Sequence, residues 1–101
     1  MLIDASRSYI HRACWLADHK EQGWDRTLSI LPKAMASQAA WKIATWCLEI
    51  HGGYGYMKET GVEKLVRDAA GFLHSDGVNR TLFLTAANAM FGLLPNPGKR
   101  E

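Results

Sequence analysis

The stretch Ile50-His51-Gly52-Gly53-Tyr54-Gly55-Tyr56 lies between two apolar segments and decides how the chain folds. Glycine takes positive φ angles at little steric cost and leaves its backbone N–H groups uncovered. Three glycines so close together therefore predict a tight reversal between two helices. The same glycines would also let another molecule, such as one carrying a phosphate, approach the backbone, and this second interpretation stays open.

Upstream of this stretch, apolar residues recur at helical spacing. They predict an amphipathic helix over residues 2–18 and a longer one over about 29–50. Pro32 would lie in the first turn of the longer helix, and the glycine pair would end it. The first pattern is already running at Leu2 with no capping residue ahead of it, so we expect the chain to continue something longer.

Downstream of the glycines, one short helix and one further long helix are predicted. Thr60 and Glu63 fit the T-x-x-E capping box, which starts a short third helix that ends at Gly71. A fourth helix is expected from near Asp76 to about Phe91, with an apolar side that faces the others.

The fold class that follows is all-α: an antiparallel helical bundle of three long helices and one short one. The chain has 101 residues and 48% hydrophobic content, enough for one domain. We assign residues 1–94 to the bundle. The tail over 95–101, which contains two prolines, is expected to be disordered.

Composition disfavours several classes of function. The 12 basic and 10 acidic residues are scattered, so we expect no nucleic-acid partner. No apolar run reaches the roughly 18 residues that a membrane helix needs, and the N-terminus lacks a signal-peptide pattern, so a cytoplasmic protein is expected. Cys14 and Cys47 are interpreted as reduced, small core residues.

The histidines and tryptophans bear on ligands and partners. The four histidines do not pair with one another at i, i+4, so we expect no metal site. Trp41 and Trp46 are five residues apart on one predicted helix and cannot both point at the same neighbour. One of them is expected to face a second surface, which would be a cofactor, another subunit or a broad core.

Asp76 is the carboxylate with the most unusual position, because it precedes Gly77 where a helix is predicted to start. Aspartate is among the best N-cap residues, so a purely structural role is one interpretation. The other is a general base that lies near a helix terminus and an apolar wall and removes a proton from carbon.

Four stretches carry a family resemblance: Arg12–Asp18 (RACWLAD), Lys33–Ser37 (KAMAS), Glu49–Tyr56 (EIHGGYGY) and Val62–Ala69 (VEKLVRDA). Together they resemble the C-terminal helical domain of acyl-CoA dehydrogenases, up to about Met90. The resemblance implies a flavoprotein family with three domains, usually assembled as dimers of dimers. This chain resembles only the later part of the last domain, so the resemblance implies that other parts carry most of the FAD and acyl-CoA contacts.

The resemblance also implies roles for particular residues. Many members place a glutamate base seven residues past the alanine of RDA, and the corresponding residue here is Asp76. It is one methylene shorter, and in this respect the chain resembles nitroalkane oxidases and some dehydrogenases of cyclic acyl-CoAs. Gly77, which follows the base, would be substrate-binding.

Four further positions match cofactor contacts of the family. Gly52 and Gly53 are retained and would lie near FAD. Glu49 stands where the family has glutamine, and its carboxylate would repel the FAD pyrophosphate. Val78 stands where the family usually has threonine, and it cannot donate a side-chain hydrogen bond.

The function implied is FAD-dependent α,β-dehydrogenation of an acyl-CoA thioester, an oxidoreductase reaction on a CH–CH group, with Asp76 as base. Weak flavin binding and little turnover are expected of the chain by itself, with a separate polypeptide supplying missing domains. Two alternatives stay open. One is a self-associating bundle that forms a homodimer or tetramer, and the other is a small-ligand binding module without catalysis.

Overall fold

The computed structural model describes residues 1–93 and contains only helices and turns over that range. Its main helices are α1 (Leu2–Asp18), α2 (Thr27–His51), α4 (Val62–Phe72) and α5 (Asn79–Met90). Three single turns join them: η1 (Lys20–Gln22), α3 (Gly53–Tyr56) and η2 (Lys58–Thr60). The predicted all-α class is confirmed, whereas the tail over 95–101 lies outside the described residues.

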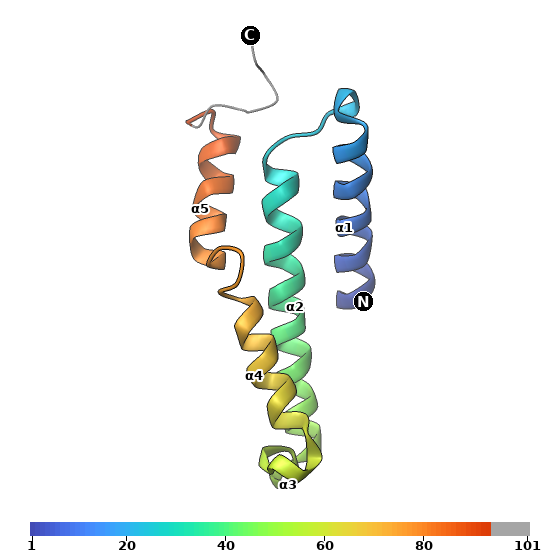
Figure 1. Ribbon diagram of the computed structural model, residues 1–101, viewed down its shortest axis with the longest axis vertical. Helices are drawn as coiled ribbons and strands as arrows, with labels where there is room; N and C mark the ends of the chain where they lie inside the picture. Colours follow the sequence, from blue (N-terminus) through green and yellow to red (C-terminus); the bar gives the residue numbers. More distant parts are fainter. Residues whose placement is uncertain (94–101) are drawn as a thin grey trace.

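The helices form one flat layer with α2 in the centre (Figure 1). α1 packs on one side of α2, and α4 and α5 follow one another along the other side, both antiparallel to α2. Neither α4 nor α5 contacts α1 in the described part of the chain. The Cα radius of gyration is 16.8 Å, against about 13 Å for a compact domain of this length. The antiparallel bundle is therefore present, but no helix within residues 1–93 covers its broad faces.

The core is correspondingly thin and is made mostly of small or medium side chains. The buried apolar residues are Leu16, Leu28, Ile30, Ala34, Ala39, Val62, Ala69 and Ala86. Trp41 and Trp46 are 37% and 47% exposed, so each lies partly on the surface. Cys14 is also exposed, so its assignment to the core was wrong, because it lies on the side of α1 that α2 does not cover.

The glycine turn behaves as predicted. Gly52 ends α2 at φ +58°, and its N–H donates to Glu49 O at 3.0 Å. The turn then folds back so closely that a Cβ on Gly55 would lie 2.7 Å from Leu48 O. Gly55 is thus required by the fold itself, because no larger residue fits against the last turn of α2.

The predicted starts of α2, α4 and α5 were wrong, and α5 begins at Asn79 instead of near Asp76. α2 begins at Thr27, before the predicted start, because the Asp25 carboxylate accepts from the Thr27 N–H at 2.6 Å and from its hydroxyl. Pro32 consequently lies in the second turn. α4 begins after Gly61, which has φ +73°, and no capping box forms.

The side chains expected to form that capping box have other partners. Thr60 Oγ1 donates to Met57 O and accepts from the Val62 N–H only at 3.4 Å. Glu63 turns away and accepts from Arg67 Nε at 2.8 Å. α4 also runs through Gly71 to Phe72, one residue beyond the predicted end.

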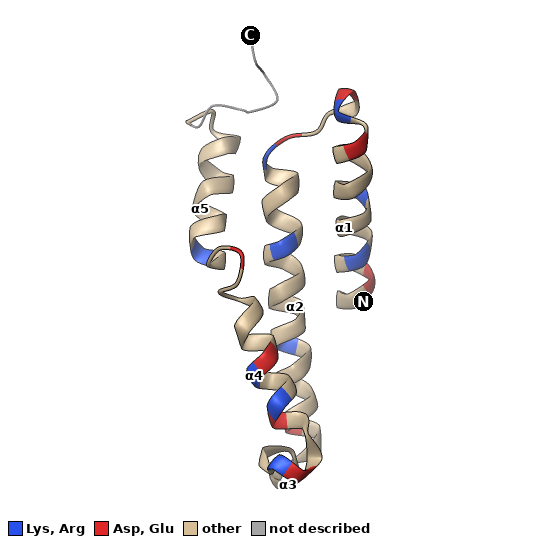
Figure 2. Cartoon of the chain, viewed as in Figure 1, with Lys and Arg blue, Asp and Glu red and all other residues tan. Residues whose placement is uncertain are grey.

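Charged residues of both signs lie on α1, on α4 and in the turns, whereas α2 and α5 are mostly uncharged (Figure 2). Within residues 1–93, no helix is long and apolar enough to cross a membrane. In the same range, no three His, Cys, Asp or Glu side chains gather as metal ligands would.

Candidate functional site

The residues singled out by the sequence fall at two separate places. Asp76, Gly77 and Val78 lie in the turn between α4 and α5, beside the first half of α2. Glu49, Gly52 and Gly53 lie at the opposite end of α2. Lys33, which contacts the first place, and Gly52 are about 28 Å apart along the helix at 1.5 Å per residue. One copy of the chain does not bring the two sets together.

The turn that carries Asp76 has an unusual backbone. Asp76 has φ +52°, the one non-glycine residue in the described chain with a positive φ, and Gly77 follows at φ +102°. Aspartate is one of the few residue types that tolerate this left-handed conformation. A backbone bond from the Asn79 N–H to Leu73 O, 3.1 Å long, closes the turn.

Asp76 does not cap α5, so the structural interpretation drawn from the sequence was wrong. The helix begins at Asn79, and the residue before it is Val78, in an extended conformation. The Asp76 carboxylate is exposed and has no hydrogen-bond partner within residues 1–93. Within the described residues, the Asp76 carboxylate therefore maintains no structural hydrogen bond.

Side chains from α2 hold the turn in place. Lys33 Nζ donates to Gly77 O at 2.8 Å and to Asn79 Oδ1 at 2.9 Å. Asn79 Nδ2 in turn donates to Ser37 Oγ at 2.8 Å. Asn79 and Ser37 are buried, so the bond between them is shielded from competing water, whereas the bond from Lys33 to Gly77 O is exposed.

This cluster was missed from the sequence, although a signal was present. Lys33 lies between Pro32 and Ala34, both of which are buried in α2. A lysine next to such residues requires a polar partner, because an unpaired charge is costly near a core. The sequence did not show which residue would provide that partner.

The glycine end of α2 offers an open approach but unfavourable electrostatics for a phosphate. A Cβ on Gly52 or Gly53 would meet nothing within 4 Å, so another molecule can approach both residues. However, the carbonyl end of a helix carries partial negative charge, and the exposed Glu49 adds a carboxylate there. These residues alone do not fit a pyrophosphate group.

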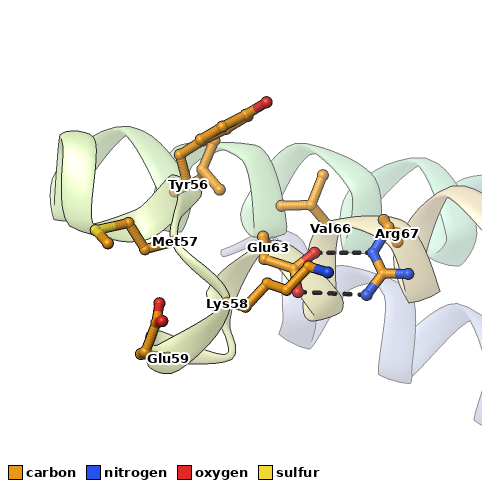
Figure 3. Close-up of a pocket in the computed structure, with 8 residues that line it drawn as sticks. Tyr56, Met57, Lys58, Glu59, Glu63, Val66 and Arg67 are labelled. Atoms are coloured by element: carbon orange, nitrogen blue, oxygen red, sulfur yellow. Dashed lines mark hydrogen bonds and ion pairs between the residues drawn. The ribbon is translucent and has the colours of Figure 1, made fainter.

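An open groove of about 640 Å³ lies beside this end, between the last turn of α2 and the start of α4 (Figure 3). Its residues are Leu48, Tyr56, Met57, Lys58, Glu59, Glu63, Val66 and Arg67. The hydrogen bond to Glu63, followed by the carboxylate's charge, raises the pKa of Arg67. The predicted site residues do not line this groove.

Comparison with known proteins identifies the family. The model of the "Acyl-CoA dehydrogenase, C-terminal domain" matches residues 1–91. The chain belongs to the acyl-CoA dehydrogenase family. The resemblance drawn from the four sequence stretches is thereby confirmed, as is the assignment to the C-terminal helical domain.

Individual relatives agree with this assignment. The very long-chain specific acyl-CoA dehydrogenase of Mus musculus is 39% identical over 74% of this chain and 12% of its own length. The cyclohexane-1-carbonyl-CoA dehydrogenase of Geobacter metallireducens is 36% identical over 84% of this chain and 22% of its own length. This acyl-CoA dehydrogenase domain thus spans less than a quarter of either relative.

A solved structure shows the same fold. A chain from the structure of the electron transferring flavoprotein of Acidaminococcus fermentans superposes with a TM-score of 0.75 and 27% identity. The match covers 88% of this chain and 23% of the other. The flat layer of helices therefore corresponds to one part of a much larger polypeptide.

Proposed function

We propose that this chain is the base-carrying part of an acyl-CoA dehydrogenase, in which Asp76 removes the α-proton of an acyl-CoA thioester. The observation that carries the proposal is the Asp76 carboxylate itself. It is exposed, has no hydrogen-bond partner in the described chain, and projects from a turn fixed to α2 through Lys33. A general base needs this combination of a fixed position and a free oxygen.

In the proposed reaction, an Asp76 oxygen takes the α-proton, and the electron pair of that C–H bond forms the new double bond. The β-hydrogen leaves with its electrons to an acceptor outside this chain. Members of this family depend on FAD for that role. Since Glu49 and the carbonyl end of α2 do not fit a pyrophosphate, we propose that groups from other parts of the enzyme hold the flavin.

The separation of the two predicted places supports an oligomeric enzyme. The Asp76 turn contacts α2 at Lys33, and the glycine turn ends α2 about 28 Å away. The two turns would therefore serve different active sites, the first in its own subunit and the second in a neighbouring subunit. Proteins of this family are typically oligomeric. We propose that Gly52 and Gly53 approach the FAD of an adjacent subunit, Val78 the FAD of their own, and Gly77 the thioester.

The substrate class follows from the length of the base. Asp76 reaches one methylene less than a glutamate would, so its oxygen needs a substrate that sits closer to the turn. The similarity to a cyclohexane-1-carbonyl-CoA dehydrogenase favours a compact or cyclic acyl group. The cytoplasmic compartment expected from the sequence stays a prediction.

A chimera tests the base. This chain replaces the matching segment of the Geobacter metallireducens dehydrogenase, and reduction of a dye by cyclohexane-1-carbonyl-CoA is measured. We expect Asp76→Asn to lower kcat by about 10³-fold or more, with the flavin absorbance and melting temperature unchanged. Asp18→Asn, on an exposed residue of α1, is the matched control. Turnover within tenfold of the parent chimera in Asp76→Asn would exclude the base role.

The stability of the chain alone provides an independent check. Because the Asp76 carboxylate caps no helix, we expect Asp76→Asn to change the free energy of unfolding by less than about 0.5 kcal/mol. Asparagine also tolerates positive φ. A loss of 1 kcal/mol or more, about the size of an N-cap contribution, would return Asp76 to a structural role.

Self-association is a second candidate function, and a specific observation favours it. Large apolar side chains are exposed on the uncovered faces and at the glycine end of α2, among them Trp46, Ile50, Tyr54 and Leu65. Apolar surface of this kind marks a contact surface for another protein. The chain would then act as an interaction bundle whose surfaces pair in a homodimer or tetramer.

A further inference from the structure

We propose that Lys33 is a positioning residue, which sets the direction of the Asp76 carboxylate from across the helix pair. This inference rests on the proposed function for the role of Asp76. The hydrogen bonds from Lys33 to the turn, which we call the clamp, are observed independently of that function. Lys33 belongs to α2, and Asp76 belongs to the turn between α4 and α5. The lysine never touches the reacting atoms in this arrangement, since its ammonium is bound to the turn's backbone and to Asn79.

The backbone of the turn is strained at one residue. A residue other than glycine persists at positive φ only where its surroundings hold it. Asp76 is such a residue, and the flexible Gly77 follows it; both are exposed. Backbone bonds close the turn around them, and a further restraint from elsewhere in the fold would fix the direction of the Asp76 side chain.

Lys33 supplies that restraint at two points. Its ammonium donates to Gly77 O, directly after Asp76, and to Asn79 Oδ1, at the start of α5. The two acceptors lie on either side of Val78, so one cation fixes both the exit from the positive-φ pair and the first residue of the helix. Charge-assisted hydrogen bonds are stronger than neutral ones.

Asn79 extends the clamp into the core. Its amide nitrogen donates to Ser37 Oγ, and Ser37 in turn donates to Ala34 O. Ala34 has no exposed surface, and Asn79 and Ser37 are 6% exposed. The turn is therefore tied to the most buried part of α2, which has little freedom to move.

The turn also packs against α5. A Cβ on Gly77 would lie 3.0 Å from Leu82 Cδ2 on α5. The turn thus rests on Leu82 from one direction and is held by Lys33 from the other. Removing the lysine leaves the packing contact, which fixes distance but not the orientation of the peptide groups.

Amide hydrogen exchange on the full 101-residue chain tests the clamp. The Ser75 N–H donates to Gly71 O and the Asn79 N–H to Leu73 O, so both report on the turn. We expect Lys33→Met to speed exchange at these two amides by about tenfold or more while the His19 amide at the end of α1 is unaffected. Lys42→Met, an exposed lysine of the same helix, is the matched control and changes none of them.

A spectroscopic signature separates positioning from simple support. At positive φ the amide and Hα protons of one residue lie unusually close, which gives Asp76 a strong intraresidue nuclear Overhauser effect. This signal should weaken in Lys33→Met and persist in Lys42→Met. In the active chimera, Lys33→Met should lower kcat and leave KM unchanged.

Other results would overturn the proposal. Unchanged exchange and an unchanged Asp76 signal would show that the turn holds itself. Uniformly faster exchange across all helices would show that Lys33 supports the whole fold. Lys33→Gln keeps a polar group on α2 and repeats the test if the methionine variant does not fold. If neither variant folds, Lys33 supports the whole fold and the positioning role is rejected. Failure of Asp76→Asn to affect turnover would remove the catalytic role and leave the clamp intact.

Discussion

At the scale of single residues, buried hydroxyl groups show which polar contacts stabilise this fold. Ser6 on α1 and Ser37 on α2 are 7% and 6% exposed. Ser37 Oγ accepts from Asn79 and donates to Ala34 O. Ser6 Oγ is buried without any partner in the described chain. A buried polar group without a hydrogen bond costs free energy, whereas a bonded one contributes to stability.

Replacing each serine by alanine should therefore have opposite effects. We expect Ser6→Ala to raise the free energy of unfolding by about 0.5–1 kcal/mol, because it removes an unsatisfied hydroxyl and improves helix propensity. We expect Ser37→Ala to lower it by about 1–2 kcal/mol, because Asn79 loses a partner. Urea unfolding followed by circular dichroism measures both. Equal effects of the same sign would show that hydrogen bonding does not distinguish the two sites.

At the scale of elements, the helix ends are set by backbone conformation more often than by side-chain caps. Gly52 and Gly61 both take positive φ, one at the end of α2 and one before α4. Gly92 does the same after α5. The side chain of Thr60, which the sequence pattern favoured as a cap, makes only a long bond to the Val62 N–H. Glycine conformation is therefore the main signal at these three boundaries.

The start of α4 offers a direct comparison. We expect Gly61→Ala to lower the free energy of unfolding by about 1–2 kcal/mol, because alanine is strained at φ +73°. A Cβ there would meet nothing within 4 Å, so the cost comes from the backbone alone. Thr60→Ala should cost less than about 0.5 kcal/mol. Thermal unfolding of both variants provides the measurement. A larger loss of stability in Thr60→Ala than in Gly61→Ala would show that the Thr60 side chain does cap α4.

Local signals predicted the elements well and their contacts less well. Helical spacing gave α1 its bounds, and the glycines gave the end of α2, because both depend on neighbours in sequence. The partners of Lys33 and Asn79 could not be predicted, since a contact between α2 and the α4–α5 turn depends on how the helices pack. Asp76 illustrates the same limit, because an aspartate before a helix can be a cap or a left-handed turn residue.

At the scale of the whole molecule, the single layer of helices determines how the chain meets other surfaces. The principal extents are 58 × 23 × 17 Å, so the shortest dimension is under a third of the longest. Within residues 1–93, α2 contacts α1 along one edge and α4 and α5 along the other (Figure 1). In that range no further helix covers the broad faces of α2.

Self-association at these surfaces should depend on the exposed apolar side chains. Ile50 is 85% exposed near the end of α2. We expect Ile50→Lys to raise the dissociation constant of a dimer by about tenfold or more. Gln38→Lys introduces the same charge at an exposed polar position of α2 and should have little effect. Sedimentation velocity provides the measurement, and a parent chain that stays monomeric at about 100 µM, a concentration that would populate a dimer of micromolar affinity, would contradict the idea.

The continuous helix α2 fixes both the distance and the rotation between the Asp76 turn and the glycine turn. Inserting one residue between Lys33 and Gly52 would lengthen the helix by about 1.5 Å and turn one end by about 100° relative to the other. The Asp76 turn and the glycine turn would then point in new relative directions, although every local contact could re-form. Loops elsewhere can gain or lose residues without this effect. Length changes in related enzymes should therefore avoid this one segment.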